Sequence, residues 1–175
     1  FCSSLTAITI PNSVTNIGSE AFYGCENLSS VSLGNGLKII ESGAFWSCYS
    51  LTSIVIPNSV TTIGSFSFAD CDLSSVVIGE SVTSIGKCAF WNTSLTSITI
   101  PEGVTSIESM TFYNCSYLAS ITLPDGLKTI GGMAFKDCSS LTSITIPKGV
   151  TSIGSSAFSG CSKLDAVYVK ATIPP

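Results

Sequence analysis

Hydrophobic and polar residues recur along this chain with a period of 22 or 23 residues. A Leu marks the start of each repeat, and the steps between successive marking leucines are 23, 23, 22, 22, 23, 23 and 23 residues. The marking residues are Leu5, Leu28, Leu51, Leu73, Leu95, Leu118, Leu141 and Leu164. We number the positions of each repeat as slots, with this Leu at slot 1. Slot 4 is always Ile or Val, and slots 13 and 18 are Ile and Phe in all seven full repeats, so the pattern predicts a repeat architecture.

The first half of each repeat has the pattern of two short extended segments. In "LTSITI" (141–146) slots 4 and 6 are apolar, whereas slots 3 and 5 carry Ser or Thr. This alternation predicts a half-buried β-strand. Pro or Gly at slot 7 ends the strand, and turn residues such as "NS" or "DG" follow. A second extended piece comes next, as in "VTSI" (150–153).

The second half of each repeat has a different pattern. In "GSSAFSGC" (154–161) a Ser near the start can cap a helix. The Ala, Phe and Cys of slots 17, 18 and 21 would lie on one helical face. The pattern therefore predicts one or two helical turns here.

One repeat has too few apolar residues to form a core by itself. Stacked repeats bury one continuous core, and stacking places the strands parallel in one sheet. We therefore expect a solenoid in which each repeat covers the apolar side of the next.

The repeat "LxxIxIPxxVxxIGxxAFxxC" resembles the leucine-rich repeat family, and most closely its BspA-like subfamily, also called the Treponema pallidum type. The resemblance covers essentially the whole chain, and "IGxxAFxxC" is specific for the subtype. It implies an α/β solenoid: a right-handed leucine-rich repeat superhelix with one parallel β-sheet and short helical or irregular turns on the opposite face. Thr93 replaces the slot-21 Cys, and Glu41 and Glu108 replace the slot-14 Gly, so that turn cannot strictly demand a positive φ.

The repeats extend over the whole chain. We expect a single leucine-rich repeat domain over residues 1–175, with seven full repeats from Leu5 and partial repeats at both ends. The last repeat loses the pattern in "ATIPP" (171–175), where Ile173 still fills slot 10 and two prolines follow, as expected at the end of a solenoid. Because the chain opens in the middle of the pattern, we expect a fragment of a longer protein.

Composition excludes several classes of function. The chain has no His and no Arg, its formal net charge is −4, and only 10% of its residues are charged. Without His, a Ser-His-Asp or Cys-His catalytic set is not possible, and the usual metal ligand is missing. The negative charge does not suit nucleic acid, and the apolar runs are too short to span a membrane. We therefore expect no enzyme, no cofactor, no metal, no nucleic-acid partner and no membrane insertion in this segment.

Eight cysteines raise the question of disulfides. Seven of them occupy slot 21 or its equivalent: Cys2, Cys25, Cys48, Cys71, Cys115, Cys138 and Cys161. Side chains in parallel register do not converge as a disulfide requires, so we expect a ladder of buried free thiols. Cys88 lies at slot 16 instead, where we expect it to face outward, as a reactive thiol or as an ordinary semi-exposed residue.

Two outward surfaces are candidates for binding. Slots 16 and 19 are three apart and would share a helical face, where they form an aromatic band. We expect its residues to bind a ligand, with packing between neighbouring turns as the alternative: Tyr23, Trp46, Phe66, Trp91, Met110, Tyr113 and Met133.

The sheet face is the second candidate, and it displays slots 3 and 5. Its candidate residues are Ser97, Thr99, Ser120, Thr122, Ser143, Thr145 and Tyr168, and Val55 and Val77 occupy slot 5 in two earlier repeats. This surface is small and hydroxylated, with almost none of the large anchors that concentrate affinity, so a ladder that only solubilises the sheet is the alternative. The slot-8 residues form a further stripe that we expect to be a solvated edge: Asn12, Asn35, Asn58, Glu80, Glu102, Asp125 and Lys148.

The resemblance also implies a class of function. BspA-like proteins are surface-exposed or secreted proteins of host-associated bacteria, and they are implicated in adhesion to host matrix proteins such as fibronectin and fibrinogen. We therefore expect a cell-surface or extracellular adhesion module whose partner is a protein or glycoprotein, extracellular matrix proteins among them. The alternative is a structural spacer or stalk that displays another domain. Aromatic rings open to solvent in the band favour binding, and rings packed against neighbouring turns favour the spacer.

Overall fold

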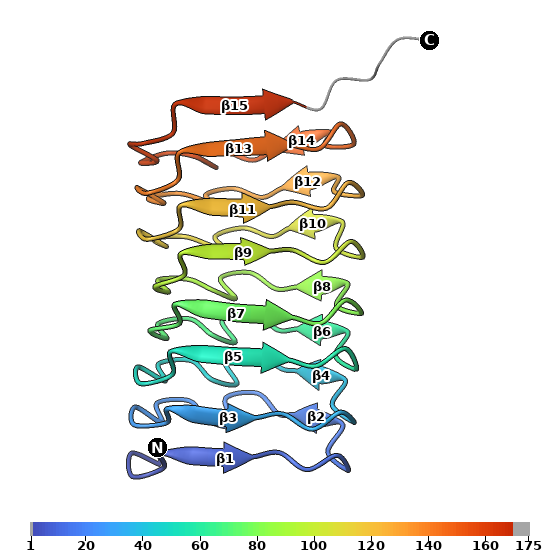
Figure 1. Ribbon diagram of the computed structural model, residues 1–175, viewed down its shortest axis with the longest axis vertical. Coiled ribbons are helices and arrows are strands. Elements are labelled where there is room, and N and C mark those ends of the chain that lie inside the picture. Colours follow the sequence, from blue (N-terminus) through green and yellow to red (C-terminus); the bar gives the residue numbers. More distant parts are fainter. Residues whose placement is uncertain (1, 170–175) are drawn as a thin grey trace.

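The computed structural model describes residues 2–169, which form a column of stacked repeats (Figure 1). The repeats follow one another in sequence order, so the N-terminal repeat lies at one end of the column and the C-terminal repeat at the other. Each repeat runs once around the column, and equivalent slots of consecutive repeats lie above one another. This confirms the predicted solenoid of parallel strands.

The first extended segment of each repeat forms a strand on the front face of Figure 1. These strands are β1 (Ala7–Thr9), β3 (Ser30–Ser32), β5 (Ser53–Ile56), β7 (Ser75–Ile78), β9 (Ser97–Thr99), β11 (Ser120–Thr122), β13 (Ser143–Ile146) and β15 (Ala166–Val169). They pair in parallel and slot to slot, as between Ser53 and Ser75. Hydrogen bonds join them as β1–β3, β5–β7, β9–β11 and β13–β15, and these pairs stack along one face rather than forming one uninterrupted ladder.

The second extended segment forms a two-residue strand on another side of the column. These strands are β2 (Asn16–Ile17), β4 (Ile39–Ile40), β6 (Thr62–Ile63), β8 (Ser84–Ile85), β10 (Ser106–Ile107), β12 (Thr129–Ile130) and β14 (Ser152–Ile153). They build two parallel ladders, β2–β4–β6–β8 and β10–β12–β14. The slot-13 Ile of each strand points inward and is buried from the first repeat to the sixth.

The core is one continuous cluster along the column. Its central feature is a stack of the slot-18 phenylalanines, of which Phe45, Phe68, Phe90, Phe112 and Phe135 are fully buried. Consecutive rings lie nearly parallel, with centroids 5.6 Å apart between Phe68 and Phe90 and 5.7 Å apart between Phe90 and Phe112. Offset stacking at this spacing is favourable beyond the burial of the rings, so every inner repeat is held by the two beside it.

The prediction of helical turns in the second half of each repeat is wrong. The structure contains no helix between residues 2 and 169, so the fold is a β-solenoid and not an α/β solenoid. Slots 16 and 20 have a positive φ in all seven full repeats, for example Phe66 at 56° and Asp70 at 55°. A left-handed residue cannot continue a right-handed helix, so two such residues in each repeat prevent helix formation.

Hydrogen bonds between repeats explain this conformation. The amides of Cys88, Phe90 and Asn92 donate to the next repeat, at 3.2, 3.0 and 2.8 Å from the carbonyl oxygens of residues 109, 111 and 113. The amide of Trp91 instead donates within its own repeat to the Cys88 carbonyl, at 3.1 Å. Successive amides therefore alternate between hydrogen bonds to the next repeat and hydrogen bonds within their own repeat. These bonds satisfy the backbone donors without a helix. Because there is no helix in the described residues, none is long and apolar enough to cross a bilayer.

The slot-14 glycines allow neighbouring repeats to approach closely. None of them has a positive φ, which agrees with the presence of Glu41 and Glu108 at this slot. A Cβ atom on Gly86 would lie 2.5 Å from the amide nitrogen of Ser65 in the preceding repeat, whereas a Cβ atom on Gly18 would meet nothing within 4 Å. The glycine therefore supplies space and not backbone freedom.

The ladder of slot-21 cysteines forms as predicted in the inner repeats. Cys25, Cys48, Cys71, Cys115 and Cys138 are buried free thiols, while Cys161 is half-buried and Cys2 is exposed at the ends of the ladder. From Cys48 onward, each thiol of the ladder lies near the carbonyl oxygen of a slot-18 Phe in the preceding repeat, as Cys71 does to Phe45 at 3.0 Å. Thr93 occupies the same slot and donates from Oγ1 to the Phe90 carbonyl at 3.0 Å.

The prediction that Cys88 faces outward is wrong. Its side chain is only 6% exposed. The reason is the stacking of repeats, because this small residue shares slot 16 with the larger Phe66 and Met110 of the adjacent repeats. Burial raises the pKa of the Cys88 thiol, which favours its neutral and unreactive form.

Candidate binding surfaces

The predicted aromatic band assembles into a continuous row of rings. The ring centroids of Tyr23 and Trp46 are 5.1 Å apart, and those of Trp46 and Phe66 are 5.3 Å apart. Trp91 then meets Phe66 at 6.2 Å and Tyr113 at 6.3 Å, both edge to face. Each ring thus contacts a ring of the neighbouring repeat.

Polar contacts accompany this row, one within it and one at its C-terminal end. The Trp46 indole donates from Nε1 to Asp70 Oδ2 at 3.0 Å, and the Lys136 ammonium lies 5.4 Å from the Tyr113 ring centroid. All seven predicted band residues, Met110 and Met133 included, are half-buried. This is the geometry expected from packing between neighbouring repeats.

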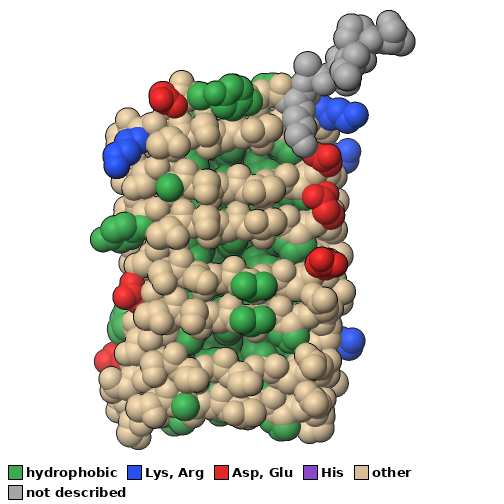
Figure 2. Space-filling model, viewed as in Figure 1, with side chains coloured by type: hydrophobic (Ala, Val, Ile, Leu, Met, Phe, Trp, Pro, Cys, Tyr) green, Lys and Arg blue, Asp and Glu red, His purple; other side chains and the backbone are tan. Residues whose placement is uncertain are grey.

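The sheet face is open to solvent instead. All seven of its predicted residues, Ser97, Thr99, Ser120, Thr122, Ser143, Thr145 and Tyr168, are exposed. Figure 2 shows this face, which is covered mainly by polar side chains and backbone and has a few separate hydrophobic spots. Val55 and Val77, adjacent in the β5–β7 register, are 64% and 57% exposed. They form an apolar patch near the middle of the column.

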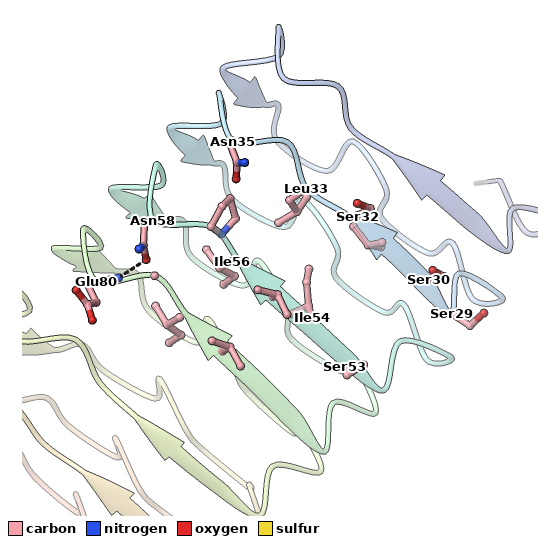
Figure 3. Close-up of a pocket in the computed structure, with 16 residues that line it drawn as sticks. Ser29, Ser30, Ser32, Leu33, Asn35, Ser53, Ile54, Ile56, Asn58 and Glu80 are labelled. Atoms are coloured by element: carbon pink, nitrogen blue, oxygen red, sulfur yellow. Dashed lines mark hydrogen bonds between the residues drawn. The ribbon is translucent and has the colours of Figure 1, made fainter.

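Two shallow grooves lie on the sheet face. The first has a volume of about 780 Å³ and crosses β3, β5 and β7, with Val55 and Val77 among its lining residues (Figure 3). The second has a volume of about 930 Å³ and crosses β7, β9 and β11. Four predicted residues, Ser97, Thr99, Ser120 and Thr122, line the second groove. Ser143, Thr145 and Tyr168 lie farther along the column, outside both grooves.

Our sequence prediction of the site did not include the residues that join the two grooves. Val77 and Glu80 line both, and Val55 lies beside Val77. The signal in the sequence is Val at slot 5 in two consecutive repeats, where later repeats have Thr. Whether these two valines can contact a partner depends on how far their side chains are exposed in the stacked structure. The pattern of a single repeat does not reveal that exposure.

Acidic side chains lie along both edges of this face, and those of one edge border the grooves (Figure 2). No charged side chain occupies slot 3 or slot 5 of strands β1 to β15. At slot 8, beyond the ends of β7, β9 and β11, Glu80, Glu102 and Asp125 are exposed, and Figure 2 shows acidic side chains along the right-hand edge of the face. The edge is ordered by hydrogen bonds, since the Glu80 amide donates to Asn58 Oδ1 at 3.0 Å (Figure 3).

A smaller notch of about 380 Å³ lies beside the aromatic band, where two consecutive repeats are one residue shorter after slot 21. Its acidic groups are bonded within the chain. Asn92 donates from Nδ2 to Asp70 Oδ1 at 2.8 Å, and Ser94 donates to Asp72. Among residues 2–169, no cluster of three His, Cys, Asp or Glu side chains is arranged to hold a metal ion.

Comparisons with known proteins bear on the whole chain. A family profile described as the BspA type leucine rich repeat region matches residues 1–95 and 83–174 in six copies. No curated protein matches the chain.

Solved structures share the fold. A leucine-rich repeat protein of Treponema pallidum is 33% identical, with a TM-score of 0.74 over 93% of this chain and 66% of that protein. A leucine-rich repeat protein of Bacteroides ovatus is 24% identical, with a TM-score of 0.62 over 97% of this chain and 62% of that protein. The second likeness shows the fold alone. The chain spans less than two thirds of the length of either relative.

Proposed function

This chain belongs to the BspA-type leucine-rich repeat family, and we propose that it is a non-enzymatic cell-surface or secreted adhesion module that binds a protein or glycoprotein on its sheet face. The observation that carries this proposal is the pair of grooves that meet at Val77, on an exposed face whose slots 3 and 5 carry no charged side chain. Small apolar groups surrounded by hydroxyls can be covered by a partner without burying an unpaired charge.

The sheet face suits binding because it is preorganised. Its strands are held by backbone hydrogen bonds to neighbouring repeats, so a partner meets a surface that loses little conformational freedom on binding. Repetition adds to this effect, because similar weak contacts recur along the column and can act together. Extracellular matrix proteins such as fibronectin and fibrinogen are the partners that we expect from membership of the family.

The aromatic band supports the alternative function of a spacer. Its rings contact each other across repeats, and this lateral packing stiffens a column. A stalk needs such stiffness and no ligand. Binding would therefore depend on the exposed sheet face, whereas a spacer role would depend on the packed aromatic band.

The test is binding of the chain to immobilised fibronectin, fibrinogen and a glycan panel, with two double variants compared. Val55→Thr/Val77→Thr replaces the apolar patch with the residue that slot 5 carries in β9, so folding is preserved. We expect this variant to bind roughly tenfold more weakly, because two apolar contacts are lost. Trp46→Ala/Trp91→Ala serves as the comparison for the aromatic band, after circular dichroism has established that it is folded.

The outcomes separate the possibilities. Binding that only the valine variant weakens supports the sheet face. Binding that only the folded tryptophan variant loses would move the site to the aromatic band and overturn our placement. No binding to any of these surfaces would favour the spacer.

A further inference from the structure

We infer that the partner segment which occupies the sheet face is basic, with lysine or arginine side chains beside Glu80 and Glu102. This inference rests on the proposed function, because it names the chemistry of the partner at the same surface. It goes further in assigning a role to the slot-8 edge.

The first step is that one occupant touches the apolar patch and the acidic edge together. Val77 and Glu80 belong to one repeat, at slots 5 and 8, and both line both grooves. Glu102 lines the second groove as well. A segment lying in either groove over Val77 is therefore in contact with the Glu80 side of the groove, so its charge matters to its binding.

The second step is that the charged side chains lining the two grooves, Glu80 and Glu102, are both acidic. Glu80, Glu102 and Asp125 follow one another in three consecutive repeats, at the carboxyl ends of β7, β9 and β11. The row is bounded, since slot 8 is Asn58 in the repeat before it and Lys148 in the repeat after it. This acidic stretch of slot 8 therefore lies beside the grooves, where Glu80 and Glu102 contribute a local negative potential.

The third step is the spacing. Neighbouring strands lie about 4.8 Å apart, so Glu80 and Glu102, at the same slot of consecutive repeats, are offset by roughly that distance along the column. An extended segment places alternate side chains on one side about 7 Å apart. Two basic side chains at positions i and i+2, with flexible stems, can therefore each reach one of these two carboxylates, while the side chains between them face away from the edge.

The fourth step concerns what the charge excludes. Nucleic acids and anionic lipid surfaces carry the same sign as this edge and would be repelled. A protein segment with alternating basic and small apolar residues meets both the carboxylates and the patch of Val55 and Val77. Complementary charge of this kind raises association rates and selects partners more than it raises affinity.

The experiment uses the chain labelled with ¹⁵N and with ¹³C in valine methyl groups. It is titrated with three synthetic peptides of equal length that alternate Lys-Val, Ser-Val and Glu-Val. We expect the Lys-Val peptide to shift the methyl signals of Val55 and Val77 and the amide signals of Glu80 and Glu102. We expect the shifts to weaken between about 0.05 and 0.5 M NaCl, because salt screens exposed charges.

Two charge variants give the matched comparison. Glu80→Gln/Glu102→Gln should weaken binding of the Lys-Val peptide roughly fivefold. Glu26→Gln/Asp165→Asn removes the same charge from exposed positions away from the grooves, and it should leave the affinity unchanged. Equal losses in both variants would mean that net charge alone is sensed.

Three results overturn the inference: equal binding of the Glu-Val peptide, equal losses in the two charge variants, or shifts confined to another face. Absence of peptide binding also overturns it. In each of these cases the proposed function still stands if Val55→Thr/Val77→Thr weakens binding to a matrix protein. Failure of both experiments removes the proposed function with it.

Discussion

The indole of Trp46 donates a hydrogen bond to Asp70 in the next repeat, with 3.0 Å between Nε1 and Oδ2. The other carboxylate oxygen of Asp70 accepts from Asn92 Nδ2, one repeat further along, at 2.8 Å. Asp70 has a φ of 55°, so it occupies one of the two left-handed positions of its repeat. One carboxylate therefore links three repeats and fixes the side of the column that carries the aromatic band.

Removal of the Trp46 side chain should destabilise the fold. We expect Trp46→Ala to lower the free energy of unfolding by about 2–3 kcal/mol, because it removes two ring contacts and the bond to Asp70. Trp46→Phe should keep most of the packing and cost about 1 kcal/mol. Urea denaturation measures both values. Tyr49→Ala is the control, since this aromatic residue is 53% exposed, and a loss as large as that of Trp46→Ala would contradict a packing role specific to the band.

A methyl group at Gly86 should force two repeats apart. We expect Gly86→Ala to cost about 2–3 kcal/mol, because the added Cβ atom would lie 2.5 Å from the Ser65 amide nitrogen. Gly18→Ala is the same substitution at the same slot with open space around it, and it should be neutral or slightly stabilising. Thermal unfolding of the two variants decides this, and equal melting temperatures would rule out close approach as the reason for glycine.

Ser67 offers a stabilising substitution. Its hydroxyl is fully buried and has no hydrogen-bond partner, whereas Ala89 fills the same slot in the next repeat. We expect Ser67→Ala to raise the free energy of unfolding by about 1 kcal/mol, because it removes an unsatisfied polar group without creating a large cavity. Chemical denaturation tests this, with Thr111→Val as the comparison. That variant should destabilise, since Thr111 Oγ1 donates to the Glu108 carbonyl at 2.8 Å.

The buried Cys115 thiol should make stability fall at alkaline pH. Burial raises the pKa of the Cys115 thiol from 9.0 to about 11. The folded state therefore holds this proton more tightly than the unfolded state, so the contribution is complete below about pH 9 and is lost as pH rises toward 11. The loss from this one thiol is on the order of 2–3 kcal/mol.

Comparison of the wild type with Cys115→Ala at pH 8 and pH 11 isolates this effect. The variant should be less stable at pH 8 but should lose less stability on going to pH 11. Parallel pH dependence in the two proteins would show that Cys115 does not titrate in this range. Thiol labelling at pH 8 should modify Cys2 first, because it is exposed.

The left-handed slots should tolerate glycine and reject β-branched residues. Ser156 is exposed and has a φ of 56°. We expect Ser156→Val to cost about 1–2 kcal/mol and Ser156→Gly to change stability by less than about 0.5 kcal/mol. Ser155→Val is the control, because Ser155 is also exposed and has no left-handed backbone. Similar costs of valine at the two positions would exclude backbone strain as the cause.

Much of the inner structure follows from the sequence because burial repeats with the period of the chain. Slot-18 residues such as Phe90 and slot-1 residues such as Leu95 lie inside as predicted, since each repeat has to cover the apolar side of the next. The two extended segments are also present in every full repeat. In a solenoid, side-chain direction is set by the slot, and the slot can be counted from sequence alone.

The second half of the repeat could not be predicted in the same way. Phe66, Cys88 and Met110 adopt a positive φ, which such residues seldom do, so their side chains carry no signal of it. Hydrogen bonds to the neighbouring repeat hold them there, and those bonds exist only once the repeats are stacked. A pattern of Ala, Phe and Cys that is compatible with a helix therefore forms a chain of left-handed turns.

The sequence by itself determined which slots face inward, and thereby the column, its parallel strands and its core. Only the tertiary structure decided which outward residues remain available. Trp46 and Val55 both occupy outward slots, but Trp46 is wide enough to reach the rings of adjacent repeats and is half-buried against them. Val55 is short and stands upright on a strand, so stacking leaves it exposed. An outward side chain is buried when it is long enough to span the distance to the next repeat, and it stays exposed when it is shorter.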